Sequence, residues 1–186
     1  MVKLNIGSNS KKVKGFKNLD IQALRKVDIV WDCIKTPYPF DSGDVEEIIS
    51  EEFLEHISFR DTIPVLMEWH RILKPKGKLY IQVPAIDKMC EMFANKEVCP
   101  DNNCIPHKPN GIVKANPNCQ FCNGKGKVNL NRWKFAFSGA QKHLWDAHLN
   151  HFTKSELREN LYRAGFQNVR ISYDEYEWKL KANCQK

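Results

Sequence analysis

The chain has 186 residues, of which 42% are hydrophobic and 27% are charged, the composition of a soluble globular protein with one domain-sized core. No apolar run approaches the roughly 20 residues of a membrane helix, and the N-terminal residues lack the apolar segment of a secretion signal, so we expect a cytoplasmic protein with no membrane partner. The net charge of +7 permits an anionic partner such as RNA; the alternative is that the lysine-rich stretch 11–17 is a solvated loop.

Short apolar segments separated by turns dominate the first half of the chain. Strands are predicted at residues 2–6, 28–31, 45–49 and 79–83, where apolar and β-branched residues are concentrated. Between the last two strands, apolar residues at helical spacing predict a helix at 61–73, which Lys74-Pro75-Lys76-Gly77 stops. A strand–helix–strand succession with tight turns indicates a parallel sheet with a right-handed crossover.

Regular structure returns in the last part of the chain. A helix is predicted at 153–164, where Thr153 and Glu156 have capping-box spacing and Gly165 ends the helix. Strands are predicted at 166–173 and 176–180, the second antiparallel to the first. The whole chain, 1–186, is expected to form one α/β domain.

Residues from about 89 to 131 interrupt this pattern, because Asn, Pro, Lys, Gly and Cys replace the apolar periodicity. A structureless loop of this length is unusual inside a compact domain, so we expect a metal to hold it. Four cysteines with turn-like spacing suit a tetrahedral structural zinc site: Cys99, Cys104, Cys119 and Cys122. Residues 119–126 resemble the Cys-x-x-Cys-x-Gly-x-Gly knuckle of chaperone-type zinc domains. Free thiols and disulfides are the alternatives, and His107 is a substitute ligand.

Three short motifs follow predicted strands. Gly7 comes after the first strand, where a missing side chain lets backbone N–H groups approach a ligand. Asp20 ends a second strand, where a carboxylate can accept both hydroxyls of a ribose. Asp32 follows the third strand and either accepts an adenine amine or caps a turn. His56 follows the fourth and is either a base or a packed histidine, so no motif is specific by itself.

Together, the order of these motifs resembles the class I S-adenosylmethionine (SAM)-dependent methyltransferases. The resemblance covers most of residues 2–88 and 143–173 and is strongest to the small type 11-like branch whose chain begins directly at the first strand. It is carried by Leu4-Asn5-Ile6-Gly7, residues 15–21, 28–32 and 37–40, Leu54-Glu55-His56, residues 71–79 and Ala164-Gly165-Phe166. It implies a Rossmann-like, doubly wound, mostly parallel sheet, here with abbreviated first helices and a zinc-knuckle insertion.

The same resemblance implies SAM as the cofactor and assigns residues to it. The implied cofactor-binding residues are Gly7, Ser8, Asn9, Asp20, Ile21, Asp32, Cys33 and Glu51. In this family Asp20 would hold the ribose, Asp32 the adenine amine, and residues 51–56 would lie beneath the sulfonium. Because the sulfonium methyl is already electrophilic, the protein mainly aligns a nucleophile with it, and a general base helps where the nucleophile carries a proton. The candidate bases are His56, His143, His148 and Glu55, among which the sequence does not choose.

The sequence departs from the family pattern in two places. Gly7-Ser8-Asn9 stands where Gly-x-Gly is usual, and because Asn tolerates positive φ better than other non-glycine residues, the turn is expected to survive. Asp20 follows Gly7 by 13 residues, against about 20 in dinucleotide-binding folds, which leaves no room for a full helix. One face of the sheet is therefore expected to be thinly covered, and we predict that a homodimer partner or the insertion covers it.

The leading hypothesis is a SAM-dependent methyltransferase whose acceptor is a sugar, another small metabolite or RNA. The aromatic and basic segment 133–145 would lie above the cofactor in this family, although such aromatics also serve as packing. Ser50-Glu51-Glu52-Phe53 lacks the Asn/Asp-Pro-Pro-aromatic motif of nucleic-acid N-methyltransferases, which disfavours an adenine-N6 enzyme. The alternative is a non-catalytic methyltransferase-like zinc module that binds nucleic acid or protein. A nicotinamide-dependent oxidoreductase is disfavoured by the absent Gly-x-Gly-x-x-Gly.

Overall fold

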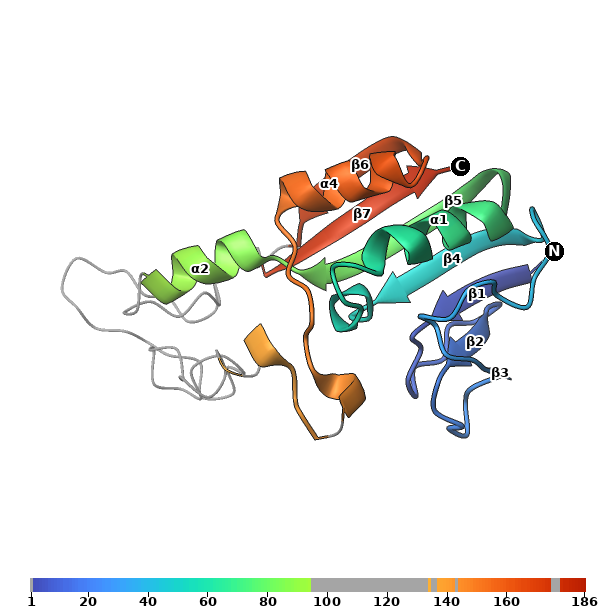
Figure 1. Cartoon of the computed structure of the whole chain (residues 1–186), viewed down its shortest axis with the longest axis horizontal. Coiled ribbons are helices and arrows are strands. Elements are labelled where there is room, and N and C mark those ends of the chain that lie inside the picture. The colour runs from blue at the N-terminus through green and yellow to red at the C-terminus, as the bar shows by residue number, and fades with distance from the viewer. Residues whose placement is uncertain (1, 95–133, 135–136, 143, 175–177) are drawn as a thin grey trace.

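Seven strands form one mixed sheet in the order β3-β2-β1-β4-β5-β7-β6 (Figure 1). The computed structural model describes residues 2–94, 134, 137–142, 144–174 and 178–186. All strand pairs are parallel except those of β7, which is antiparallel to both β5 and β6. The strands are β1 (Val2–Ile6), β2 (Lys17–Asp20), β3 (Ile29–Val30), β4 (Val45–Glu51), β5 (Leu73–Pro84), β6 (Gln167–Tyr173) and β7 (Lys179–Gln185). The predicted mostly parallel α/β sheet is confirmed.

Two helices lie side by side on one face of this sheet (Figure 1). Helix α1 (Thr62–Ile72) packs on the sheet through Val65, Leu66 and Trp69, which are fully buried. Helix α4 (Lys154–Arg163) begins where the Thr153 hydroxyl accepts a hydrogen bond from the Glu156 amide at 3.2 Å, so the predicted N-cap is confirmed. A single core of aliphatic and aromatic residues, of which Trp69, Phe152 and Phe166 are the largest, fills the space between the helices and the sheet.

Three boundaries differ most from the prediction. Strand β5 begins at Leu73 and not at residue 79, so it includes the residues 74–77 that were expected to form a turn. Helix α2 (Ile86–Ala94) runs across the predicted start of the insertion near residue 89, because Met89 is buried and continues the apolar face. The last strand, β7, runs on to Gln185 instead of ending at residue 180, because Leu180, Ala182 and Cys184 alternate with polar residues and face the core.

The opposite face of the sheet is mostly polar, although Ile49 and Tyr80 also lie on it. Residues 7–44, all of which are described, contain no helix, so the abbreviated first helices are confirmed. Lys3, Glu47, Lys78 and Gln185 lie in one row across β1, β4, β5 and β7. The Lys3 Nζ atom lies 2.8 Å from a Glu47 carboxylate oxygen. Parallel sheets are usually covered on both faces, but an ion-paired face such as this one can be solvated. The homodimer stays a prediction, and this row offers it no apolar surface.

The loop that replaces the first helix is held by buried amides. Asn5 Nδ2 donates to the Lys11 carbonyl at 3.0 Å and to the Asn18 side-chain oxygen at 3.1 Å. Asn18 Nδ2 donates to the Lys26 carbonyl at 2.7 Å. These side chains satisfy loop carbonyls that would otherwise need a helix or water, and they fix the turn that follows β1.

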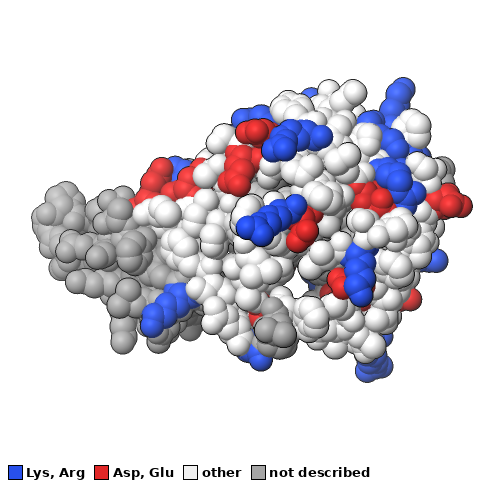
Figure 2. Space-filling model, viewed as in Figure 1, with Lys and Arg blue, Asp and Glu red and all other residues white. Residues whose placement is uncertain are grey.

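The charges on the helical face are mixed. Figure 2 shows basic and acidic side chains interspersed over the face that carries α1 and α4, and the described residues of this face form no continuous basic surface. Among those same residues, no helix is long and apolar enough to cross a membrane.

Candidate functional site

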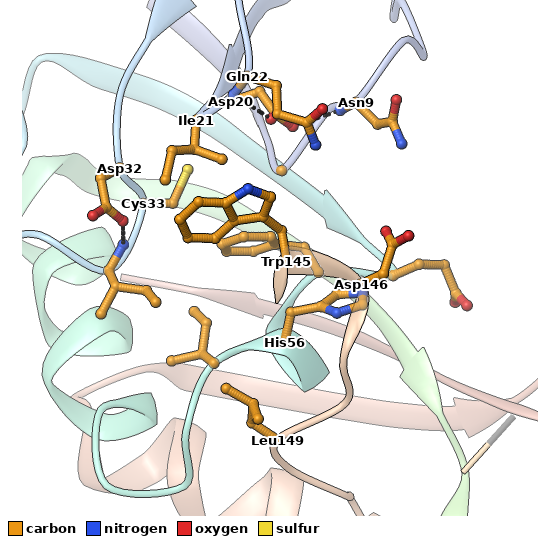
Figure 3. A pocket seen from close by; sticks show the side chains of 15 residues that line it. Asn9, Asp20, Ile21, Gln22, Asp32, Cys33, His56, Trp145, Asp146 and Leu149 are labelled. Atoms are coloured by element: carbon orange, nitrogen blue, oxygen red, sulfur yellow. Dashed lines mark hydrogen bonds between the residues drawn. The ribbon is translucent and has the colours of Figure 1, made fainter. Parts of the chain in front are cut away.

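A pocket of about 240 Å³ opens at the carboxyl ends of β1, β2 and β4 (Figure 3). The strand order reverses between β1 and β4, and ligands of open α/β sheets bind at such switch points. Six of the eight residues assigned to the cofactor from the sequence line this pocket: Gly7, Asn9, Asp20, Ile21, Asp32 and Cys33. The sequence order therefore places polar groups from three separate connections around one space.

The turn after β1 has the predicted left-handed conformation. Gly7 has a φ of 67° and Asn9 a φ of 47°, so Asn does take the positive φ that the missing second glycine requires. The Gly7 and Ser8 amides donate to the Leu19 carbonyl at 2.9 and 3.2 Å. A Cβ at Gly7 would lie 2.2 Å from the Phe53 ring. Glycine is thus required here for packing as well as for its φ.

Asp20 ends β2 and faces the pocket with 7% of its surface exposed. One carboxylate oxygen accepts from the Asn9 amide at 2.7 Å, and the other accepts from the Gln22 amide at 3.0 Å. Each oxygen keeps a second lone pair for a ligand hydroxyl. The turn and the acid therefore fix each other.

Asp32 follows β3 and is held in a turn. Its carboxylate accepts from the Ile34 amide at 3.2 Å, and Lys35 Nζ lies 3.8 Å away. This is the turn cap that the sequence left open as an alternative, and the second carboxylate oxygen of Asp32 makes only the long ion pair with Lys35. The neighbouring Cys33 is buried, and burial raises the pKa of its thiol to about 12, so this sulfur stays neutral and is not a nucleophile.

The loop that carries Asp32 and Cys33 is anchored to α1. The Tyr38 hydroxyl donates to the Cys33 carbonyl at 2.6 Å and accepts from Trp69 Nε1 at 3.0 Å. The Tyr38 amide donates to Glu68 at 2.6 Å, and Arg71 binds the same carboxylate through two nitrogens at 2.7 and 2.8 Å. The Arg71 hydrogen bond lowers the pKa of Glu68.

Two residues assigned to the cofactor do not line the pocket. Ser8 is buried, and its hydroxyl lies 3.4 Å from the Asn9 carbonyl oxygen. Glu51 is the last residue of β4 and pairs with Lys11 outside the pocket. Glu52 lines the pocket instead, with a φ of 54° that turns the chain. Of the expected stretch 51–56, Glu52 lines the pocket and Glu51 does not, because alternation along β4 puts Glu51 on the polar face of the sheet.

The candidate bases meet beside the pocket. His56 ends the 3₁₀ turn η1 (Leu54–His56), and its ring contacts the His148 ring edge-to-face with centroids 4.9 Å apart. His56 Nδ1 lies 3.0 Å from the Ala147 carbonyl oxygen. Glu55 is 1% exposed, and burial followed by the charge of Glu52 raises the pKa of its carboxyl well above its ordinary value. His143 lies outside the described residues.

The four cysteines of the predicted zinc site also lie outside the described residues, as does His107. The zinc knuckle therefore stays a prediction. The three remaining cysteines are free, with Cys33 and Cys184 buried and Cys90 exposed.

Glu52 and Phe53 line the pocket and fall within the stretch 51–56 that was expected beneath the sulfonium, and Ile34 directly follows Cys33. Four further pocket residues belong to no motif that the sequence reveals: Gln22, Ile57, Asp146 and Leu149. They come from loops whose path depends on tertiary packing. Trp145 belongs to the aromatic segment that was expected above the cofactor, and it lies in the short 3₁₀ turn η2 (Leu144–Asp146). Figure 3 shows its indole in the middle of the pocket, between Cys33 and His56.

No protein-family model and no curated protein matches the sequence. Solved structures do match it. A SAM-dependent methyltransferase from Methanosarcina mazei aligns with 99% of this chain and 91% of its own, with a TM-score of 0.57 and 16% identity. The 1,6-didemethyltoxoflavin-N1-methyltransferase of Burkholderia thailandensis, solved with 1,6-didemethyltoxoflavin and S-adenosylhomocysteine bound, aligns with 100% of this chain and 70% of its own, with a TM-score of 0.56 and 13% identity.

A third neighbour, a possible exported protein from Bordetella parapertussis, matches with a TM-score of 0.55 and 11% identity, and the chain spans 61% of its length. Likeness at such low identity shows a shared architecture, and it agrees with the strand order and with the position of the pocket at the switch point. The chain has the fold of the class I SAM-dependent methyltransferases.

Proposed function

We propose that this protein is a methyltransferase that binds SAM in the pocket at the ends of β1, β2 and β4. One observation carries the proposal: Asp20 and Asp32, on separate loops, both line a single pocket at the sheet switch point. Two such carboxylates can accept hydrogen bonds from the ribose hydroxyls and from the adenine amine of one nucleoside.

The residues present fit this cofactor. Both oxygens of Asp20 are oriented by backbone amides and keep lone pairs for the ribose hydroxyls. Ile21, Cys33 and the Trp145 indole give the space between the two acids apolar walls suited to a purine (Figure 3). Because the indole lies in the middle of the pocket, we expect it to move when the cofactor enters.

When bound, SAM would supply an electrophilic methyl group on its sulfonium. The chain's own residues would then hold the acceptor in line with that methyl and exclude water. His56 lies on the pocket wall near Glu52 and Phe53, and its Nδ1 faces the Ala147 carbonyl, which can only accept. Its Nε2 therefore carries the lone pair and is available to take a proton from the acceptor.

The acceptor is proposed as a small metabolite, a sugar or RNA. The mixed charges of the helical face favour a small molecule (Figure 2). Residues 95–133 contain six Lys and Arg residues and two acidic residues, a local charge of +4. This positive charge is compatible with RNA as the acceptor. We also propose the structural zinc at Cys99, Cys104, Cys119 and Cys122, which a count of bound zinc and its loss on Cys119→Ser would test.

The test of the proposed function is calorimetric titration with S-adenosylhomocysteine of the wild type and of Asp20→Asn. The substitution keeps the shape but replaces one acceptor by a donor, and a hydrogen bond to a charged group contributes about 1.5–3 kcal/mol, so we expect roughly a 10- to 100-fold weaker Kd. The matched control is Asp61→Asn, because Asp61 is exposed and its side chain makes no capping bond to α1.

Equal affinity of the wild type and Asp20→Asn would contradict the assignment of the ribose site. Absence of binding to the folded wild type would favour the non-catalytic module.

A further inference from the structure

Glu55 carries a buried carboxyl group with no hydrogen-bond partner in the part of the chain that the structure describes. It is 1% exposed, and neither of its side-chain oxygens has a hydrogen-bond partner among the described residues. Buried carboxylates in native proteins are normally paired with a cation or with hydrogen-bond donors, because an unpaired one loses its hydration without compensation. Within the described part of the chain, no group fills this role for Glu55.

Two imidazoles face this carboxylate. Glu55, His56 and His148 each offer one ligand atom, and these atoms all lie within 4.8 Å of one another. Metal bonds of about 2.0–2.2 Å would bring them to roughly 3.4 Å apart, a contraction that the partly exposed imidazoles can supply by rotating. Two imidazole nitrogens and one carboxylate oxygen are a ligand set that suits divalent first-row transition metals.

The outer contacts of His56 are those of a metal ligand. Its Nδ1 lies 3.0 Å from the Ala147 carbonyl oxygen, so Nδ1 carries the hydrogen and Nε2 is left as a ligand. Metal-binding histidines usually donate their second nitrogen to a carbonyl or carboxylate in this way, which fixes the ring and its tautomer.

The backbone holds the two ligand-bearing segments together. The amides of Leu149 and Asn150 both donate to the Glu55 carbonyl, at 2.8 and 3.0 Å. The Asn150 side chain is buried and donates to Thr62 at 3.0 Å. Gly139 lets the chain cross next to Asp146, whose carbonyl oxygen a Cβ would approach to 1.7 Å. The ligands are therefore preorganised although they come from segments about 90 residues apart in the chain.

We propose that Glu55, His56 and His148 bind one divalent transition-metal ion at the edge of the pocket. Three protein ligands leave coordination positions open, as in catalytic rather than structural sites. His56 lines the pocket, so an open position is within reach of a molecule bound there. This site is separate from the cysteine zinc proposed above, whose sulfur ligands leave no open position.

The role of the ion rests on the proposed methyl transfer. With the ion bound, His56 Nε2 is a ligand and no longer takes the acceptor's proton. An acceptor hydroxyl that coordinates the ion has a lowered pKa and gives its proton to water instead. The oxygen lone pair forms the bond to the cofactor methyl carbon, while the carbon–sulfur bond breaks and its electron pair stays on sulfur. The site therefore narrows the acceptor to a molecule that presents an oxygen nucleophile, such as a phenol or a sugar hydroxyl.

The test is calorimetric titration of the full chain with Co²⁺, without SAM or its product, in the wild type, Glu55→Gln and His148→Ala. Loss of a second-shell partner alone weakens metal affinity about 10- to 100-fold, so loss of a ligand is expected to weaken one Co²⁺ site by at least about 100-fold. The matched control is His151→Ala, because the ring of His151 lies 6.5 Å from that of His148 but is not in the ligand group. It is expected to keep the wild-type affinity.

Thermal unfolding separates loss of the site from loss of the fold. With the cysteine site already filled by zinc, Co²⁺ is expected to raise the Tm of the wild type and of His151→Ala but not of folded Glu55→Gln. Equal Co²⁺ stoichiometry and affinity in all four proteins would overturn the site. The Co²⁺ titration contains neither SAM nor its product, so its result is independent of the titration with S-adenosylhomocysteine. The metal site and the cofactor site can therefore be disproved separately.

Discussion

The Asn9 amide donates a 2.7 Å hydrogen bond to the carboxylate of Asp20, so the turn after β1 orients the acid at the end of β2. This bond joins the altered glycine turn to the acid that is assigned to the ribose. A turn without its second glycine keeps its shape because Asn9 adopts positive φ, and its amide then points at the acid.

Substitutions at Asn9 test this turn. We expect Asn9→Ala to lower the free energy of unfolding by about 1 kcal/mol, because Ala is strained at a φ of 47°. The free energy of unfolding of Asn9→Gly is expected to lie within about 0.5 kcal/mol of the wild-type value, because Gly adopts this φ without strain. Urea unfolding measures both, and a more stable Asn9→Ala than Asn9→Gly would contradict the argument.

A second prediction concerns the contact between Gly7 and Phe53. Gly7→Ala is expected to lower the free energy of unfolding by about 2–4 kcal/mol, because its Cβ would lie 2.2 Å from the Phe53 ring and its φ is 67°. Gly15→Ala is the matched control, since Gly15 has a φ of 85° but a Cβ added there would meet no atom within 4 Å.

Gly15→Ala thus measures the cost of the φ alone, about 1 kcal/mol. If Gly7→Ala costs no more than this control under the same denaturant titration, the close approach of Phe53 does not limit the turn.

Trp145 provides an optical signal for ligand entry. It is 51% exposed and lines the pocket, whereas Trp69 is fully buried in the core. We expect S-adenosylhomocysteine to change the tryptophan emission of the wild type, and we expect most of this change to disappear in Trp145→Phe. An undiminished emission change in Trp145→Phe would place the moving indole elsewhere in the chain.

The Glu68–Arg71 pair predicts a pH dependence of stability. Glu68 has a lowered pKa in the folded state, chiefly through its hydrogen bonds from Arg71. Its stabilising effect is therefore complete above the unfolded pKa of about 4.3 and is lost as the pH falls through the lowered folded pKa. Glu68→Gln is expected to cost about 2 kcal/mol at pH 7.

The measurement is the free energy of unfolding of both proteins between pH 7 and pH 3. The difference between them should shrink below about pH 4 as the wild-type carboxylate takes up its proton. A constant difference over this range would show that the charge of Glu68 does not anchor the loop after β3.

The sequence predicted the framework better than the site, for physical reasons. Strands such as β1 and helices such as α4 are local patterns of apolar spacing and caps, and Thr153 caps α4 as expected. The acids Asp20 and Asp32 were found because strand ends of a parallel sheet meet at one edge. The choice of Glu52 over Glu51 depended on a local turn with positive φ, which the sequence does not encode in a recognisable motif.

The grouping of Glu55, His56 and His148 shows the same limit more clearly. Each residue is visible in the sequence as a candidate base, but their meeting depends on the hydrogen bonds that tie residues 147–150 to η1. Contacts between segments so far apart in the chain depend on the packed fold, and they leave no periodic pattern in the sequence.

The most direct test of the central claim is calorimetric titration of the purified wild-type chain with S-adenosylhomocysteine. A pocket in which Asp20 and Asp32 hold the nucleoside predicts one binding site per chain with a micromolar Kd. No detectable heat of binding at millimolar ligand, with the protein folded, would contradict the claim that this pocket binds the cofactor.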